Sequence, residues 1–380
     1  MTNRRHDAVS RTLTASLYAV LAVAAVATAA CKGNFKPRDA GGDDADHHDP
    51  ADADPDLDVA IPDADRDSTD DDIDEDCMPS CGSRQCGTDG CGGLCAPGCG
   101  PSQACSAFGQ CEEVRPWTWA SVPGGSFAMG SLINEAGRYD NEVRHTVTLT
   151  HGFVILSTEV TQADFTALMG YNPSTYTDCG PDCPVETLNW HQAAAYCNAL
   201  SDGEGFRRCY DCDGLGRDII CTMNPAFDSP YDCPGYRLPT EAEWELSARA
   251  STTTATYNGD LPEDAIGCES PNMVLDSIAW FCGDSDGSLH AVARLEPNEL
   301  GLYDMLGNVY EWVNDLLYDY PTTPVTDPWG SSDGLLRVIR GGSWNYGASE
   351  ARAANRGWTN GGAIERLDFV GFRVARTSGP

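Results

Sequence analysis

Two acidic residues, Asp304 and Glu311, stand seven positions apart on either side of a Gly307-Asn308 pair that favours a turn. Calcium binds six to eight hard oxygen ligands and combines carboxylates with backbone carbonyls. A turn flanked by two carboxylates offers both kinds of oxygen, so we expect a calcium site here. The alternative is that both carboxylates only cap turns.

A second group of candidates consists of cysteines. Cys209 and Cys212 have the Cys-x2-Cys spacing of a redox-active pair. Cys221 and Cys233 follow in a loop rich in Gly and Asp, which favours structural disulfides that fasten the loop.

Two further cysteine pairs are close enough in sequence for local bridges, Cys179 with Cys183 and Cys268 with Cys282. Cys197 is then left over among the nine cysteines between 179 and 282. We expect it to be a free thiol, buried on one face of a helix.

Neither the histidines nor the aromatic residues define a catalytic site by spacing. The seven histidines form no His-x-His or His-Glu-x-x-His pair, and His191, at an expected helix start, is interpreted as a surface or capping residue. Four aromatic residues gather late in the chain: Trp312, Trp344, Tyr346 and Trp358. They favour either core packing or an aromatic-lined groove for a peptide or a sugar.

The elements that must hold these residues are predicted by local pattern. Strands are expected within 117–130, 147–150 and 153–155. Three helices are expected to begin after the capping residues Thr161, Asn189 and Thr240, the first of them ending at Gly170. Gly, Pro, Asn and Asp fill the rest, so the pattern indicates an α+β domain over 117–380 with few short helices and much irregular structure.

Charge narrows the possible partners. The chain has 380 residues and a formal net charge of -34. Such a chain repels phosphate backbones and anionic lipid headgroups, which excludes nucleic-acid binding.

The first 31 residues have the pattern of a bacterial lipoprotein signal peptide. Arg4, Arg5 and Arg11 precede an apolar stretch, and small residues stand before Cys31, which is the expected lipidation site and the anchor to the membrane. An uncleaved anchor helix is the alternative. Lys32 favours the outer membrane, by resemblance to lipoprotein sorting rules, so we expect an exported protein of the outer membrane or periplasm.

Two segments follow before the domain. Residues 32–76 hold 18 acidic residues against four basic ones, which predicts a disordered, solvated linker rather than a calcium-binding repeat. Residues 77–111 hold eight cysteines, and an exported module of this size needs disulfides for stability, so we prefer them to a zinc site.

Six ordered blocks between about 120 and 376 resemble the formylglycine-generating, or sulfatase-modifying factor, family. They are PGGSFAMG at 123–130, EVT at 159–161, YRLPTEAEWE at 236–245, GLYDMLGNVYEW at 301–312, RGGSW at 340–344 and GFR at 371–373. The resemblance implies one domain related to the C-type lectin fold. It also implies two calcium sites, one at Asp304, Gly307, Val309 and Glu311, and a second at Asn272, Met273, Asp286 and Ser288.

Compared with the catalytic members of this family, the sequence lacks two cysteines. Catalytic members continue the 340–344 block as Gly-Gly-Ser-x-x-Cys-x4-Cys and bind copper(I) through the two thiols. Tyr346 and Ala351 stand there instead, and no cysteine occurs between Gly283 and Pro380. In the same relatives the counterpart of Cys197 pairs with a cysteine just after Gly-Phe-Arg, where this chain has Val374.

Two functions remain open at this point. The first is an envelope-displayed binding domain with calcium, without copper, and with an unknown protein, peptide or glycan ligand. The second is a divergent oxidoreductase of the same family, with Ser343, Trp344 and Tyr346 as its candidate catalytic residues.

Overall fold

The computed structural model describes residues 103–105, 111–113, 118–330 and 334–378. The expected signal peptide 1–31 with Cys31, the linker 32–76 and most of the cysteine-rich segment 77–111 lie outside the described residues. At the end of that last segment and just beyond it, β1 (Gln103–Cys105) pairs with β2 (Cys111–Glu113) in antiparallel register. Among the described residues no helix has both the length and the apolar character needed to cross a membrane.

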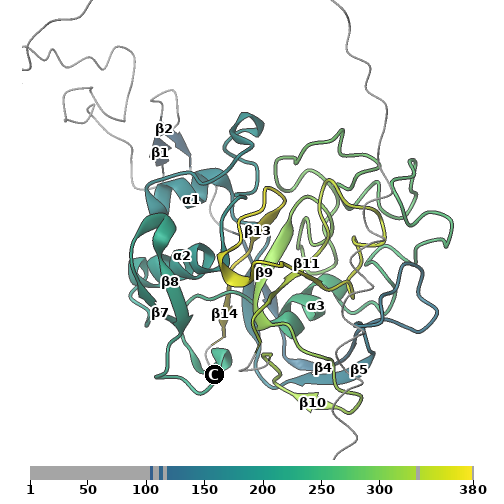
Figure 1. Cartoon of the computed structure of the whole chain (residues 1–380), viewed down its shortest axis with the longest axis horizontal. Helices are drawn as coiled ribbons and strands as arrows, with labels where there is room; N and C mark the ends of the chain where they lie inside the picture. Colours follow the sequence, from purple (N-terminus) through teal and green to yellow (C-terminus); the bar gives the residue numbers. More distant parts are fainter. Residues whose placement is uncertain (1–102, 106–110, 114–117, 331–333, 379–380) are drawn as a thin grey trace, which may run out of the picture. The chain divides into compact units, whose positions relative to one another are not determined.

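The domain is built on small sheets joined by long irregular segments (Figure 1). One has the order β10-β5-β4 (Val325–Thr326, His145–Leu149, Gly125–Met129), and another the order β14-β6-β3 (Ala375–Thr377, Phe153–Leu156, Trp119–Val122). The largest has the order β12-β11-β9-β13 (Gly357–Trp358, Arg337–Arg340, Tyr310–Leu316, Val370–Phe372). The β7 (Tyr210–Asp213) and β8 (Ile220–Met223) strands form a separate hairpin.

Each α-helix begins where its capping residue predicts. The helices α1 (Gln162–Met169), α2 (Trp190–Gly203) and α3 (Glu241–Arg249) follow complete capping boxes at Thr161, Asn189 and Thr240. Gly170 ends α1 in the left-handed conformation at φ 79°, which glycine adopts without steric cost. Four 3-10 turns complete the described helical structure: η1 (Thr177–Cys179), η2 (Gly216–Asp218), η3 (Pro230–Asp232) and η4 (Gly362–Ile364).

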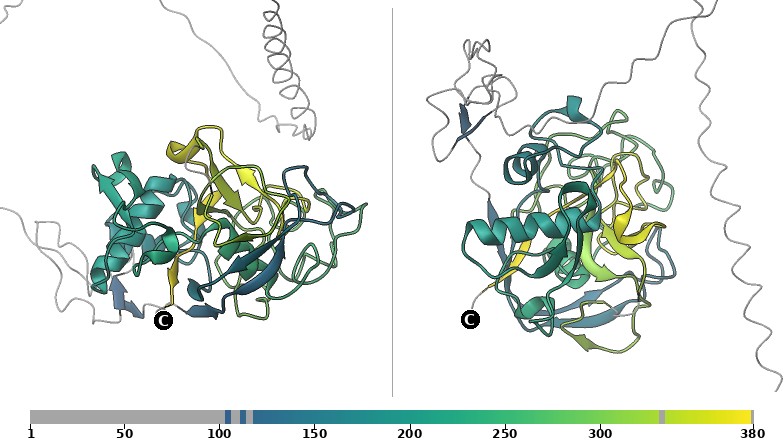
Figure 2. Two further views of the ribbon diagram at one scale, coloured as in Figure 1. Left: turned by 90° about the horizontal axis from the view of Figure 1, so that it is seen from below. Right: turned by 60° about the vertical axis from the view of Figure 1, so that its left-hand side comes forward.

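Strand β9 separates two apolar cores. Its Tyr310 and Trp312 pack with residues of α2 and β13, whereas Val313 packs into a second cluster that includes Trp244 of α3. Figures 1 and 2 show α1, α2 and the β7–β8 hairpin on one side of β9 and β11, with β4, β5 and β10 on the other. All of β9 from Tyr310 to Asp315 is buried, and the strand contributes side chains to both cores.

The disulfides agree with the local bridges expected from spacing, Cys179–Cys183 and Cys268–Cys282. The redox interpretation of Cys209 and Cys212 is wrong, because the two residues belong to different bridges. These bridges, Cys209–Cys233 and Cys212–Cys221, fasten the 209–233 loop.

His191 corrects a second expectation. The side chain is not on the surface: the residue is 8% exposed, with its ring packed edge-on to Trp190. Its Nδ1 accepts from the Cys221 N–H at 3.1 Å, which ties α2 to β8. Burial lowers the pKa of His191, so the neutral ring serves as a structural acceptor.

Cys197 is the free cysteine of the described chain, and it is buried among α2 packing residues. Burial raises the pKa of its thiol well above the ordinary value. We therefore expect iodoacetamide to label Cys197 slowly in the native protein and completely after unfolding, as read by peptide mass spectrometry. Fast native labelling, or a disulfide from Cys197 to any loop cysteine, would contradict this structure.

Candidate functional site

The 304–309 loop and the 340–346 segment are joined by backbone hydrogen bonds. Gly307 N–H donates to the Gly341 carbonyl at 2.8 Å, and Trp344 N–H donates to the Asn308 carbonyl at 2.8 Å. Gly307 has φ 75°, and a Cβ there would lie 2.3 Å from the Trp280 carbonyl oxygen. Only glycine satisfies both limits, which explains the Gly-Asn turn at this place.

The two positions that carry thiols in catalytic relatives have separate environments. Ala351 is 1% exposed and packs in the core with Trp244. Tyr346 is 37% exposed, and its ring lines a pocket. These side chains offer copper(I) no soft ligand, and Cys197, the free thiol of the described chain, belongs to the other core. The residues present do not fit the family's copper site.

The other candidate catalytic residues are buried beside Tyr346. Ser343 is 1% exposed and its hydroxyl donates to Asn345 Oδ1 at 2.8 Å. Trp344 is 9% exposed and meets Tyr176 edge-on, with ring centroids 5.5 Å apart. Ser343 therefore faces a neutral amide instead of a base that could activate it.

The pocket beside Tyr346 has a volume of about 670 Å³. Its aromatic wall contains Tyr310, Tyr346 and Phe369, and the Tyr346 ring centroid lies 5.4 Å from that of Tyr310 and 5.3 Å from that of Phe369. Trp358, 46% exposed, and Tyr139 add two more rings. The polar lining is supplied by Asp140, Asn141, Glu350, Asn355, Arg356, Thr359, Asn360 and Glu365.

The four aromatic residues grouped in the sequence therefore divide into two pairs. Tyr346 and Trp358 line the pocket, as an aromatic groove requires. Trp312 and Trp344 are buried, and the Trp312 indole N–H donates to the Leu188 carbonyl at 3.2 Å. Proximity in sequence could not distinguish these roles, because contacts with distant residues, such as that of Tyr176 with Trp344, decide which rings are covered.

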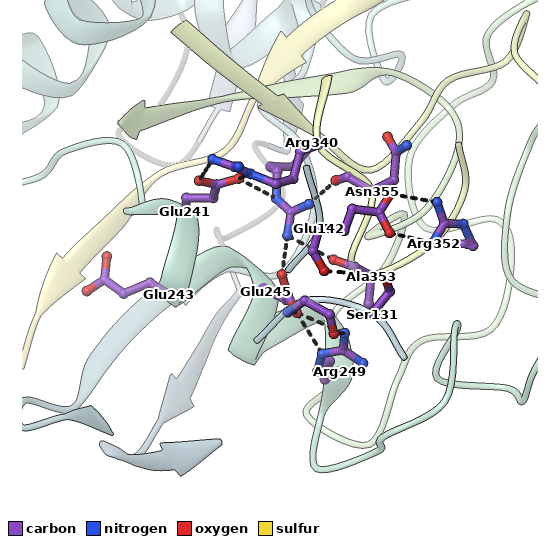
Figure 3. Close-up of polar contacts among 12 residues, drawn as sticks. Ser131, Glu142, Glu241, Glu243, Glu245, Arg249, Arg340, Arg352, Ala353 and Asn355 are labelled. Atoms are coloured by element: carbon purple, nitrogen blue, oxygen red, sulfur yellow. Dashed lines mark hydrogen bonds and ion pairs between the residues drawn. The ribbon is translucent and has the colours of Figure 1, made fainter. Parts of the chain in front are cut away.

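Buried ion pairs hold the pocket wall in place (Figure 3). Arg352 pairs with Glu142 at 2.7 Å and with Glu135 at 2.7 Å, which joins the 131–144 loop to the 349–356 segment. Arg340 pairs with Glu245 of α3 at 2.5 Å and also donates to the Ala353 carbonyl at 2.9 Å.

Helix α3 supplies Glu245 and two further acidic partners for buried arginines. Glu241 pairs with Arg356 at 2.7 Å, and Glu243 pairs with Arg237 at 2.6 Å. Although burial alone would raise the pKa of Glu241, Arg356 and Arg340 hold it below the ordinary value, so this carboxylate stays charged. The acidic 236–245 block thus fixes the scaffold around the pocket.

A carboxylate cluster lies next to the 304–309 loop and consists of Glu159, Asp304, Glu311 and their partner Arg373. Both Glu311 oxygens accept from Arg373, at 2.6 to 2.8 Å, and Glu311 also accepts from the Trp244 indole at 2.8 Å. Asp304 accepts from the Ala293 N–H at 2.7 Å. Burial raises the pKa of Asp304 to about 6.

Glu159 is the member that sequence reasoning missed. Its Oε2 lies 3.4 Å from Asn308 Nδ2, whereas its buried Oε1 has no hydrogen-bond donor among the described residues. Burial, and then the charges of Asp304 and Glu311, raise the pKa of Glu159 well above its ordinary value. The signal was the 159–161 block itself, but nothing local shows that Glu159 meets a loop about 150 positions away.

The residues of the second expected calcium site are used differently. Asn272 Oδ1 accepts from the Val274 and Leu275 N–H groups, and its Nδ2 donates to the Ala265 carbonyl. Met273 is 92% exposed. Asp286 is also exposed, at φ 53°, and the Ser288 hydroxyl donates to the Leu289 carbonyl. The Asn272 side chain therefore organises its own turn, and the second site stays a prediction.

Comparison with known proteins shows the family of the chain. Residues 107–378 match the family described as "Sulfatase-modifying factor enzyme 1-like domain". The chain belongs to this family, and its α+β architecture is that of the family.

Three similar proteins illustrate the sequence identity and coverage of these matches. The chain is 32% identical over 216 residues to a "Chaperone protein LppX" of Paenibacillus barcinonensis, covering 52% of this chain and 71% of the relative. It is 30% identical over 265 residues to a formylglycine-generating enzyme of Mycobacterium tuberculosis, covering 58% and 85%. The solved structure of Treponema denticola variable protein 1 has a TM-score of 0.57 at 29% identity, covering 69% of this chain and 95% of that one.

Proposed function

We propose that this protein is a ligand-binding member of the family, whose pocket beside Tyr346 takes a peptide or glycan without thiolate–copper oxidation. The observation that carries the proposal is the exchange of both thiol positions, one for a core methyl and one for a pocket ring. A phenol in place of a thiolate removes a copper ligand and adds a flat, amphipathic contact surface.

The pocket has the character of a binding site. Tyr346 and Trp358 are 37% and 46% exposed, so each presents an uncovered part of its ring to a ligand. Large aromatic surfaces with a few fixed polar groups are typical of sites that hold ligands. A relative named a chaperone protein favours a polypeptide as the ligand.

A divergent oxidoreductase is the competing proposal. Its candidate residues are Ser343, Trp344 and Tyr346, but the Ser343 hydroxyl is bonded to Asn345 and the Trp344 ring is buried. Burial raises the pKa of Tyr346, so its phenol stays protonated at neutral pH and is a poor base. These environments favour binding over catalysis.

The place of action belongs to the same proposal. The signal pattern of residues 1–31 and the small residues before Cys31 support an exported protein anchored by lipid in the outer membrane or periplasm. The disulfides of the domain suit an oxidising compartment. The pocket would then face other molecules of the envelope.

We also propose calcium at the carboxylate cluster, with ligands from Asp304, Gly307, Val309 and Glu311 and an added carboxylate from Glu159. Three buried carboxylates face one guanidinium, so the cluster has two excess negative charges when ionised, as a divalent cation requires. In the described residues no group of three or more His, Cys, Asp or Glu side chains could hold a metal ion. The proposed site therefore relies on the Gly307 and Val309 carbonyls together with the carboxylates. Bound calcium would neutralise the cluster.

The absence of oxidase chemistry can be tested directly. We expect the full-length protein, supplied with copper and oxygen, to leave a Cys-x-Pro-x-Arg peptide unchanged, because Tyr346 and Ala351 offer no thiolate. Mass spectrometry would detect formylglycine. Turnover that disappears in Ser343→Ala would establish the oxidoreductase instead.

Binding at the pocket needs a separate measurement. We expect a displayed library of random seven-residue peptides, or an array of oligosaccharides, to yield ligands whose affinity falls at least about tenfold in Trp358→Ala, since an anchoring aromatic residue contributes upward of 1.4 kcal/mol. The matched control is Leu215→Ala, which removes an 87% exposed side chain outside the pocket. Equal loss in both variants, or no ligand at all, would refute the proposal.

Calcium should stabilise the domain by about 2.7 kcal/mol at 100 times its dissociation constant. We expect the rise in melting temperature at pH 7.5 to disappear largely in Asp304→Asn and Glu159→Gln. It should persist in Asp315→Asn, which changes a buried carboxyl hydrogen-bonded to Glu241 N–H instead.

Acid should weaken the calcium effect. The pKa of the Asp304 carboxyl is raised to about 6 in the folded domain. As pH rises from about 4 through about 6, the unfolded chain releases this proton while the folded form keeps it, so the calcium-free domain becomes less stable. Calcium reverses that loss only where Asp304 is ionised, so the shift should be smaller at pH 5.5. If calcium raises the melting temperature of Asp304→Asn and Glu159→Gln as much as that of the unchanged protein at pH 7.5, calcium binds elsewhere.

A further inference from the structure

A short part of the pocket wall is hydrogen-bonded from behind by a surface loop. We call this part the wall stretch; it comprises residues 346–349, and its Tyr346 lines the pocket. The Ala348 N–H donates to the Gly267 carbonyl at 2.8 Å, and the next N–H of the wall stretch donates to the preceding carbonyl of the loop, also at 2.8 Å. The loop backbone therefore supplies the acceptors for two amides close to Tyr346.

The loop itself, residues 262–271, has few anchors. All of these residues are exposed or half-buried. Asn272 Nδ2 donates to the Ala265 carbonyl at 3.2 Å, and the disulfide between Cys268 and Cys282 attaches the loop covalently to the domain. A segment without buried side chains opens at a low cost in free energy, so this disulfide is its main attachment.

Both sides of the disulfide contact the wall stretch. The Cys282 N–H donates to the Tyr346 carbonyl at 3.0 Å, while Gly267, which accepts from Ala348, directly precedes Cys268. The disulfide thus joins the two backbone segments that hydrogen-bond the wall stretch. Breaking it would let these segments separate.

This disulfide is also the most accessible of the four in the described residues. Cys268 is exposed and Cys282 is half-buried. Cys209 and Cys233 are both 0% exposed, and each of the other two bridges joins a half-buried cysteine to a buried one. Thiol–disulfide exchange depends on access to a sulfur, so an attacking thiolate should reach Cys268 before the other bridges.

We infer that Cys268–Cys282 is a thiol-exchange site, and that its reduction by a dithiol of a partner protein loosens the wall stretch and thereby changes binding in the pocket. The effect on binding rests on the proposed function, whereas the exchange site and the loosening do not. The site would make the pocket responsive to the thiol chemistry of its surroundings.

The exchange balances in atoms and electrons. A thiolate of the partner attacks the Cys268 sulfur, forms a mixed disulfide and releases Cys282 as a thiolate, which takes up a proton. The second thiolate of the partner then attacks the partner's own sulfur in the mixed disulfide and releases Cys268, which also takes up a proton. Two electrons and two protons pass from the dithiol to the cystine, and the partner becomes a disulfide.

The two ends of the wall stretch keep other attachments. On one side the Trp344 N–H donates to the Asn308 carbonyl at 2.8 Å, and on the other the Ser349 carbonyl accepts from Arg352 Nε at 2.7 Å. Neither bond involves the loop. Reduction should therefore loosen the wall stretch between these two attachments and leave the remainder of the domain folded.

Graded reduction tests the exchange site. We would treat the full-length protein with dithiothreitol at pH 7.5 without denaturant, quench with iodoacetamide and map the labels by peptide mass spectrometry. We expect Cys268 and Cys282 to be labelled at least about tenfold faster than Cys209 and Cys233, because access limits the attack. Equal rates, or earlier opening of any other disulfide between 179 and 282, would overturn the inference.

Hydrogen exchange tests the loosening. In the full-length double variant Cys268→Ser/Cys282→Ser, we expect the Ala348 and Ser349 amides to exchange at least about tenfold faster, since their acceptors lie on the released loop. The Trp344 amide, whose acceptor lies outside the loop, should keep its rate.

The matched control is Cys212→Ser/Cys221→Ser, which removes the bridge between β7 and β8 and should leave these amides unchanged. Unchanged rates at Ala348 and Ser349 in the first variant would overturn the inference. Equal acceleration at Trp344 would also overturn it, because it would show general destabilisation of the domain.

Ligand binding separates this inference from the function on which part of it rests. Library or array ligands that require Trp358 should bind Cys268→Ser/Cys282→Ser several-fold more weakly than the unchanged protein. If both bind equally, the effect of the disulfide on the pocket is refuted and the binding function stands. If no ligand requires Trp358, the binding function is refuted, and the labelling and hydrogen-exchange rates alone decide the exchange site.

Discussion

The structure depends above all on buried charge pairs between arginines and glutamates. The pairs are Arg237–Glu243, Arg249–Glu245, Arg340–Glu245, Arg352–Glu142, Arg356–Glu241 and Arg373–Glu311. Removing one partner of such a pair leaves an uncompensated buried charge and typically costs about 3–5 kcal/mol. A domain with short sheets and long loops has little regular backbone pairing to fix its loops, and these pairs fix them instead.

The same pairs explain why several sequence blocks of the family supply buried side chains instead of pocket residues. The block at 236–245 contributes Arg237 and three glutamates of α3, and the block at 340–344 contributes Arg340. Their side chains meet inside the domain and not in the pocket. Membership of the family therefore follows from the scaffold, whereas chemistry follows from the few positions that face the pocket, such as Tyr346.

Local rules were sufficient for much of the fold. The capping boxes at Thr161, Asn189 and Thr240 and the terminating Gly170 are interactions within one helical turn, so the sequence predicts them directly. The α+β class and the family followed from patterns of the same local kind. The short bridges, including Cys179–Cys183, needed only nearness in the chain.

Contacts across the chain were beyond such rules. Glu159 meets Asn308, and Asn141 meets Arg356, through packing that no spacing encodes. His191 was misjudged because its place at a helix start suggests exposure, while β8 covers it. The pocket is assembled from residues between Tyr139 and Phe369 that lie far apart in the sequence, so it could be recognised only once these lay together.

The separation of the buried ion pairs from the exposed pocket residues has a consequence for which positions of the chain can vary. Tyr346 and Trp358 are exposed at the pocket and take no part in the buried pairs, so other side chains could replace them at little cost in folding free energy. Arg340 and Arg352, a few positions away, have no such freedom. One rigid frame can thus display many different pocket surfaces, and a new ligand specificity would require changes only in the side chains that the frame leaves uncovered.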